Sequence, residues 1–169
     1  MDYEAMLSGK SALITGSGRG IGKEIALSLG KRGVKVACCS RSESELTEVT
    51  YTILKSGGTA YYSALDVQNI KQLEKFCTSI KKNIGALDFV IVNAGISSEK
   101  CTIEESDPDK WKTAIGINLI GAYNTVKAAI PLLKESTAGK IIFIGSGLGR
   151  KGFPGTSSYS CSKAGLWML

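Results

Sequence analysis

Tyr159 and Lys163 are the residues of this sequence best suited to proton transfer. They stand four apart at the start of an apolar segment, 159–169, so on a helix both lie on one face. A tyrosine keeps its proton near neutral pH, but a cation one turn away favours the phenolate. The pair could therefore give a proton to an oxygen atom and take it back. A tyrosine and a lysine at this spacing also occur as a surface pair in many helices.

The other side chains narrow the available chemistry. The chain of 169 residues contains no histidine, which excludes Ser-His-Asp and Cys-His nucleophiles, a histidine base and the commoner zinc sites. Its five cysteines are odd in number and form no C-x-x-C pair, so neither a disulfide framework nor a metal site is indicated. Acid–base chemistry must use tyrosine, lysine, cysteine or a carboxylate.

Composition predicts one soluble, cytoplasmic domain over 1–169. The hydrophobic content of 43% suffices for a core, and no stretch approaches the run of about 18 apolar residues that a membrane helix needs. The N-terminus is acidic, unlike a signal peptide. The net charge of +6 comes from scattered lysines and arginines, which are typical of a solvated face. We therefore expect neither a membrane nor a nucleic acid as partner.

Short β-branched runs alternate with segments of helical period along the whole chain. The expected strands are 11–15, 34–40, 59–65, 87–92 and 140–146. Such an alternation predicts an α/β fold with a doubly wound parallel sheet. Ligands of such sheets bind beyond the carboxyl ends of the strands, and the functional residues should gather there.

Two helices carry specific expectations. In the first, Ile21, Ile25 and Leu29 recur on one side of the helix. The helix after the fourth strand should begin at Asp107, which with the following proline makes a good N-cap and first turn. Pro131 should end or bend this helix, because proline removes a hydrogen-bond donor.

The stretch TGSGRGIG, Thr15 to Gly22, follows the first strand and opens the first helix. Glycines let the backbone approach a pyrophosphate, and the free amides of a helix N-terminus supply donors. A tight strand-to-helix turn also needs glycine, so the loop by itself is weak evidence. The candidate cofactor-binding residues of this loop are Gly16, Ser17, Arg19, Gly20, Ile21 and Gly22.

The spacing T-G-x-x-x-G-I-G resembles the cofactor loop of the short-chain dehydrogenase/reductase family. Further family motifs follow in order over nearly the whole chain, namely Asp66, the NAG triplet at 93–95, Asn118, Ser146 and the YSCSK segment at 159–163. The resemblance implies a Rossmann-type sheet in the strand order 3-2-1-4-5 that lacks the family's later strands. It also implies hydride transfer between a nicotinamide cofactor and a small carbonyl or alcohol substrate.

The resemblance also implies roles for individual residues. Tyr159 would be the general acid in reduction and the base in oxidation, and Lys163 would also bind the nicotinamide ribose. Ser146 would align the substrate oxygen, and Asn118 would hold a water that relays protons. The remaining cofactor contacts would come from Asp66, Val67, Asn93, Ala94 and Gly95, with Asn93 bracing the strands and Asp66 on the adenine.

The end of the second strand distinguishes the two nicotinamide cofactors. An enzyme that uses NAD would place an acidic residue there for the ribose 2'-hydroxyl, whereas this chain has Ser40 and Arg41, with Arg19 in the glycine loop. Guanidinium groups attract a 2'-phosphate through charge-assisted hydrogen bonds. NADP is therefore expected over NAD. The alternative is that Arg41 is a solvated loop residue.

The sequence leaves open the substrate, the assembly of the protein and whether the chain is an enzyme or a binding module. The substrate would contact the loop 147–158 and segments that this chain lacks, so its identity is not readable. We expect the chain to be a fragment of a longer reductase, whose full form would be a homodimer or homotetramer. The alternative to an enzyme is a truncated dinucleotide-binding module without turnover.

Overall fold

The computed structural model describes residues 6–97 and 99–169. The first half of the fold contains β1 (Ser11–Thr15), α2 (Gly20–Lys31), β2 (Lys35–Ser40), α3 (Glu43–Lys55), β3 (Thr59–Ala64) and α4 (Ile70–Asn83). The second half contains β4 (Phe89–Val92), α5 (Pro108–Ile115), the π-helical segment η1 (Gly116–Ile120), α6 (Gly121–Leu133), β5 (Lys140–Phe143), the 3-10 turn η2 (Gly147–Gly149) and α7 (Ser157–Met168).

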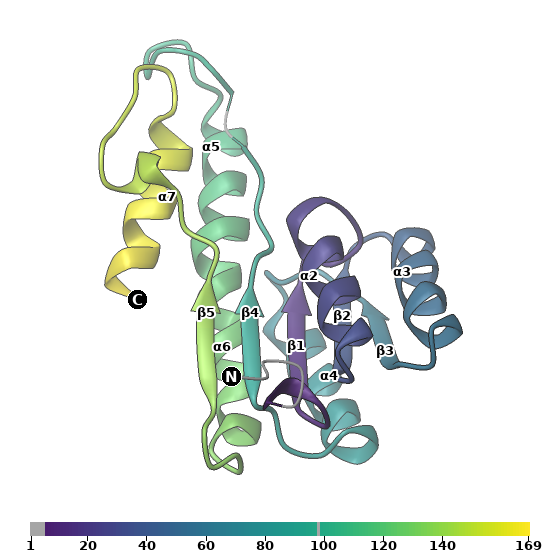
Figure 1. The fold of residues 1–169 in the computed structure, drawn as a ribbon. Coiled ribbons are helices and arrows are strands. Elements are labelled where there is room, and N and C mark those ends of the chain that lie inside the picture. The colour runs from purple at the N-terminus through teal and green to yellow at the C-terminus, as the bar shows by residue number, and fades with distance from the viewer. Residues whose placement is uncertain (1–5, 98) are drawn as a thin grey trace.

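The five strands form one parallel sheet in the order β3-β2-β1-β4-β5 (Figure 1). In the central register, Leu13 of β1 lies beside Ala37 of β2 and Val90 of β4. This arrangement confirms the predicted α/β class, the parallel sheet and the strand order. The loops that follow β4 and β5 extend beyond the carboxyl ends of the strands (Figure 1).

Alternate residues of the inner strands enter two separate cores. Ala12 and Ile14 of β1 pack with the residues of α2 and α3, and Leu13 between them packs with α4 and α6 on the other face. All three side chains are fully buried. A parallel sheet covered on both faces needs continuous apolar strands for this reason. The carboxyl ends of the strands then remain as the polar, accessible edge.

The apolar face predicted for α2 is only partly buried. Ile21 is 61% exposed, whereas the buried positions of α2 are Gly22, Ala26 and Gly30. Small residues let the helix axis approach its neighbours closely, and a Cβ at Gly30 would lie only 2.7 Å from Cγ2 of Ile53 on α3. Ile25 and Leu29 pack at the edge of the core, whereas Ile21 does not, because the closest contacts of α2 are made by its glycines and alanine.

The helix that begins after Asp107 is longer and less regular than predicted. Asp107 caps it, with Oδ1 accepting from the amide of Asp109 at 2.8 Å. The turn Gly116–Ile120 is π-helical and joins α5 to α6 without a break. Such local widening is frequent at functional sites, and here it surrounds Asn118. Pro131 lies inside α6, which ends only at Leu133.

The fifth strand is shorter than expected and lies at the edge of the sheet. It ends at Phe143 rather than at 146, so Ser146 stands three residues beyond the strand instead of at its last position. Ile141 and Ile142 are 38% and 45% exposed. Among residues 6–97 and 99–169, no helix has the length and apolar content to span a membrane.

Candidate functional site

A cavity of about 310 Å³ opens at the carboxyl ends of the inner strands. Eight residues anticipated from the sequence line it, namely Gly16, Arg19, Ser40, Arg41, Asp66, Val67, Ala94 and Gly95. Six further residues complete the wall, namely Gly18, Ser42, Glu45, Leu65, Ile96 and Ile117. We call this cavity the strand-end pocket. Its position is the one that a doubly wound sheet offers to a ligand.

The glycine loop between β1 and α2 forms one wall of the strand-end pocket. Gly16 has a φ of +64° and Gly20 a φ of +55°, which is the left-handed region that side chains with a Cβ rarely adopt. A Cβ at Gly22 would lie 2.3 Å from the carbonyl oxygen of Gly16, so the start of α2 lies directly against the loop. The N-cap residue, Arg19, makes no side-chain capping bond, which leaves the first amides of α2 without that partner.

Asn93 fixes the glycine loop to the end of β4. Its Nδ2 donates to the carbonyl oxygens of Thr15 at 2.9 Å and Gly16 at 3.1 Å. In return, Oγ1 of Thr15 accepts from the amides of Asn93 and Ala94, both at 3.1 Å. These four bonds hold the loop and the NAG segment in one rigid unit. Asn93 acts behind the strand-end pocket and does not line it.

Four other predicted loop residues also lie outside the lining of the strand-end pocket, namely Ser17, Gly20, Ile21 and Gly22. Ser17 is fully buried, and both its amide and its hydroxyl donate to the carbonyl oxygen of Cys39, at 3.2 and 3.4 Å. The side chain of Ser17 thus ties the loop to β2, because its hydroxyl is already committed there.

Four charged residues line the strand-end pocket. Arg19 and Arg41 are exposed and line it together with Glu45 of α3. Asp66 follows β3, and its Oδ1 accepts from the amide of Gln68 at 2.9 Å, which holds the carboxylate at the rim. The pocket therefore offers two guanidinium groups and two carboxylates to a polar ligand.

Tyr159 and Lys163 lie in the first turns of α7, as the spacing predicts. The Nζ atom of Lys163 lies 5.7 Å from the ring centre of Tyr159 and donates to the carbonyl oxygen of Ile144 at 2.7 Å. Lys163 is only 5% exposed, and burial lowers its pKa below the ordinary lysine value. The ammonium is held by the segment that follows β5, so it has a fixed position next to the tyrosine.

Asn118 joins α7 to the loop after β4. Its Oδ1 accepts from the amide of Ile96 at 2.8 Å, and its Nδ2 donates to the carbonyl of Ile96 and to Oγ of Ser162, both at 3.0 Å. Ser162 in turn donates to the carbonyl oxygen of Tyr159 at 2.7 Å. The asparagine side chain thus forms a clamp, and Ile96 belongs to the wall of the strand-end pocket.

Ser162 is the residue of this clamp that the sequence reasoning missed. It is fully buried and occupies the position before the lysine in YSCSK. Its spacing of three from Tyr159 was available as a signal, since residues three apart lie on neighbouring positions of a helix. Nothing in the sequence paired it with Asn118, 44 residues earlier.

Ser146 caps the short turn η2 beyond β5. Its Oγ accepts from the amide of Leu148 at 3.2 Å, and the residue is half-buried. It stands two residues after Ile144, whose carbonyl binds Lys163. The segment 144–146 therefore brings the serine and the lysine to the same strand end. Among the residues that the structure describes, none accepts the hydroxyl proton of Ser146, so this proton is available to a ligand.

The chain is similar to known proteins over almost its whole length. A family model described as short chain dehydrogenase matches residues 10–169. The ketoacyl reductase HetN of Nostoc sp. is 35% identical over 162 residues, which cover 96% of this chain and 56% of the relative. The 3-oxoacyl-(acyl-carrier-protein) reductase FabG of Vibrio harveyi is 34% identical over 160 residues, covering 95% and 64%. The chain thus spans about three fifths of the length of these relatives.

Solved structures share the fold closely. An NAD+-bound xylitol dehydrogenase superposes with a TM-score of 0.92 at 26% identity, covering 96% of this chain and 63% of that one. An alcohol dehydrogenase from Thermococcus sibiricus in complex with 5-hydroxy-NADP gives 0.88 at 30% identity, covering 92% and 66%. The two neighbours were thus solved with different nicotinamide dinucleotides.

Proposed function

The chain belongs to the short-chain dehydrogenase/reductase family, and we propose that it is the catalytic part of an NADP-dependent oxidoreductase acting on a small carbonyl or alcohol. The observation that carries the proposal is the buried Lys163, whose ammonium is fixed on the carbonyl of Ile144 beside the ring of Tyr159. Within residues 6–97 and 99–169 no carboxylate pairs with Lys163, and a buried cation in that state is costly and is retained where chemistry needs it.

The strand-end pocket fits a dinucleotide. Gly16 and Gly18 of the glycine loop line it without a side chain, which lets a diphosphate approach the loop backbone. Asp66, Arg19 and Arg41 all line it, and we assign Asp66 to the adenine amino group and the two arginines to a 2'-phosphate. These arginines favour NADP over NAD in our proposal.

The bound nicotinamide would supply or accept the hydride, and the residues of α7 would manage the proton. In reduction, the hydroxyl of Tyr159 gives its proton to the developing alkoxide, and in oxidation the phenolate takes it back. Lys163 stabilises the phenolate by its charge. Ser146 holds the substrate oxygen with its free hydroxyl proton. Asn118 positions Ile96 and, through Ser162, the backbone of Tyr159.

Two measurements test this proposal. Titration with NADPH and with NADH, followed by fluorescence, should give saturable binding with a lower Kd for NADPH. Oxidation of NADPH should then be measured against a panel of carbonyl compounds, including 3-oxoacyl thioesters, because the two relatives are named as reductases of such groups. If neither dinucleotide binds, the proposal fails. A lower Kd for NADH would overturn the preference for NADP.

The second candidate is a dinucleotide-binding module without turnover. The observation that favours it is the exposed face of β5, where Ile141 and Ile142 are 38% and 45% exposed just before the segment 144–146. Binding of NADPH together with no turnover across the panel would support this candidate. We also propose that residues 1–169 form one dinucleotide-binding domain, that the protein is cytoplasmic, and that it assembles as a homodimer or homotetramer.

A further inference from the structure

Glu45 is a carboxylate that the strand-end pocket contains and that the family motifs above do not assign. It lies in the first turn of α3, where Oγ of Ser42 accepts from its amide at 3.4 Å. The next residue, Leu46, is fully buried and anchors the helix. The backbone of Glu45 is therefore held on both sides, and its side chain is directed from a fixed point.

The carboxylate of Glu45 lies against the glycine loop. A Cβ at Gly18 would be 2.7 Å from Oε2 of Glu45 and 2.9 Å from Oγ of Ser40, so both oxygens converge on Gly18. Within residues 6–97 and 99–169, no hydrogen bond or ion pair engages this carboxylate. Glu48, one turn further along α3, does pair with Lys23 at 2.7 Å. Glu45 thus faces the pocket with its acceptor oxygens free.

A free carboxylate and two guanidinium groups at one site favour ligands of opposite charge. The carboxylate accepts hydrogen bonds from hydroxyl groups and repels phosphate, whereas Arg19 and Arg41 attract phosphate. We propose that Glu45 is a specificity-determining residue, whose carboxylate accepts from the adenosine ribose hydroxyls and opposes a 2'-phosphate. This inference rests on the proposed dinucleotide function. It makes the preference for NADP a balance between the arginines and Glu45.

Isothermal titration with ADP-ribose and 2'-phospho-ADP-ribose tests the inference without any turnover. The readout is the preference ratio, the Kd for ADP-ribose divided by the Kd for 2'-phospho-ADP-ribose. Glu45→Gln removes the charge and should raise this ratio about tenfold, because one charge-assisted contact is lost and one repulsion is relieved. Arg41→Gln should lower it by about the same factor.

Glu43→Gln is the matched control, because Glu43 lies in the same first turn of α3 and does not line the strand-end pocket. Its ratio should stay within about twofold of the wild-type ratio, since distant exposed charges are screened. Glu45→Ala should shift the ratio in the same direction as Glu45→Gln. The inference is overturned if both Glu45 variants leave the ratio unchanged or lower it. If wild-type protein binds neither compound, the proposed function fails as well, whereas binding with an unmoved ratio refutes Glu45 alone.

Discussion

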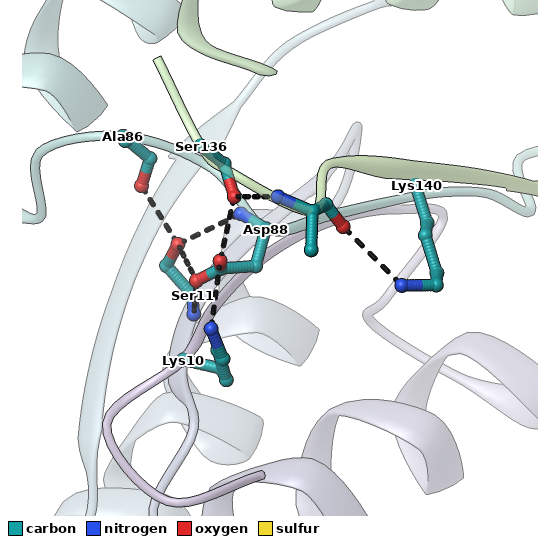
Figure 2. A network of polar contacts seen from close by, with 7 residues as sticks. Lys10, Ser11, Ala86, Asp88, Ser136 and Lys140 are labelled. Atoms are coloured by element: carbon teal, nitrogen blue, oxygen red, sulfur yellow. Dashed lines mark hydrogen bonds and ion pairs between the residues drawn. The ribbon is translucent and has the colours of Figure 1, made fainter. Parts of the chain in front are cut away.

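Each end of the sheet has a carboxylate beside it, and the two carboxylates differ in how many hydrogen bonds they accept from the protein. At the amino ends, the carboxylate of Asp88 accepts from the amide of Ser11 at 3.0 Å and from Oγ of Ser136 at 2.8 Å, and it lies 3.4 Å from Nζ of Lys10 (Figure 2). At the carboxyl ends, the carboxylate of Glu45 has no such partner within residues 6–97 and 99–169. Two carboxylates beside the same sheet are therefore in opposite situations.

This difference separates a structural role from a binding role. The network around Asp88 joins the start of β1 to the start of β4 and to the turn before β5 (Figure 2), and all its members belong to the protein. Polar groups that are already paired contribute to stability, whereas groups held in place without partners can exchange solvent for a ligand at little cost. We therefore expect substitutions at the two ends to change different quantities.

Tyr159→Phe should give the largest effect, and it should be on turnover alone. The hydroxyl of Tyr159 donates to no residue within 6–97 and 99–169, so its loss should leave the free energy of unfolding within about 0.5 kcal/mol. Turnover should fall by about 10²–10⁴-fold, the usual contribution of a general acid. Steady-state kinetics, with Kd for NADPH and thermal unfolding as companions, measure this. Tyr62→Phe on β3 is the control, and equal turnover in the two variants would remove Tyr159 from the mechanism.

Asn118→Ala should lower both the free energy of unfolding and the affinity for NADPH, because Asn118 is bonded within the protein and also positions a residue of the strand-end pocket. The residue is 1% exposed, and its loss strips partners from the amide and carbonyl of Ile96 and from Ser162. We expect the free energy of unfolding to fall by about 3 kcal/mol, the cost of leaving buried groups unpaired. Binding of NADPH should weaken as well, since Ile96 lines the strand-end pocket.

Chemical denaturation and NADPH titration of Asn118→Ala check both effects. Asn83→Ala is the control, because Asn83 is exposed on α4 and its side chain, within residues 6–97 and 99–169, bonds only to Ser79 of its own helix. That variant should change the unfolding free energy by less than about 0.5 kcal/mol. Loss of stability in Asn118→Ala with unchanged NADPH affinity would show that the clamp supports the fold and not the pocket.

The fold was readable from the sequence because its signals are local and redundant. Each buried strand is a short apolar run, and each is followed by a helical period, so the alternation fixes a parallel sheet. Details that depend on close packing were not readable. The exposed Ile21 and the buried Gly22 exchange the roles that hydrophobicity would assign, because α2 approaches its neighbours through its smallest residues.

The site residues that belong to a sequence motif could be predicted, whereas those brought together by packing between distant parts of the chain could not. The glycine loop and Arg41 stand next to strand ends, so their place in the pocket follows from topology. Glu45 and Ser162 enter through helix packing, which brings α3 to Gly18 and α7 to Asn118. The burial of Ser17 likewise depends on a bond to Cys39 of the neighbouring strand.

Asp88→Asn should change the stability of the fold without changing ligand binding. The substitution keeps the shape of the side chain and removes the charge that several donors share, so the free energy of unfolding should fall by about 2 kcal/mol. Affinity for NADPH should not change, because the network lies at the opposite end of the strands from the pocket. Asp109→Asn is the control, since the Asp109 side chain is 92% exposed beside Lys112 and its loss should cost little. A change in NADPH affinity in Asp88→Asn would mean that the two ends are coupled.

The smallest expected effect is the pH dependence of the Asp88 network. Burial raises the pKa of Asp88, but hydrogen bonds from Ser136, Ser11 and Lys10 outweigh it, so the pKa lies below the ordinary aspartate value. A carboxylate with a lowered pKa in the folded state contributes its stability above the unfolded pKa, and this contribution is lost as pH falls through the folded pKa. The gap in unfolding free energy between wild type and Asp88→Asn should therefore be constant near neutrality and narrow below about pH 4. Denaturation of both proteins across this range measures the gap, and a gap that narrows instead toward alkaline pH would assign the stabilisation to Lys10 rather than to the carboxylate.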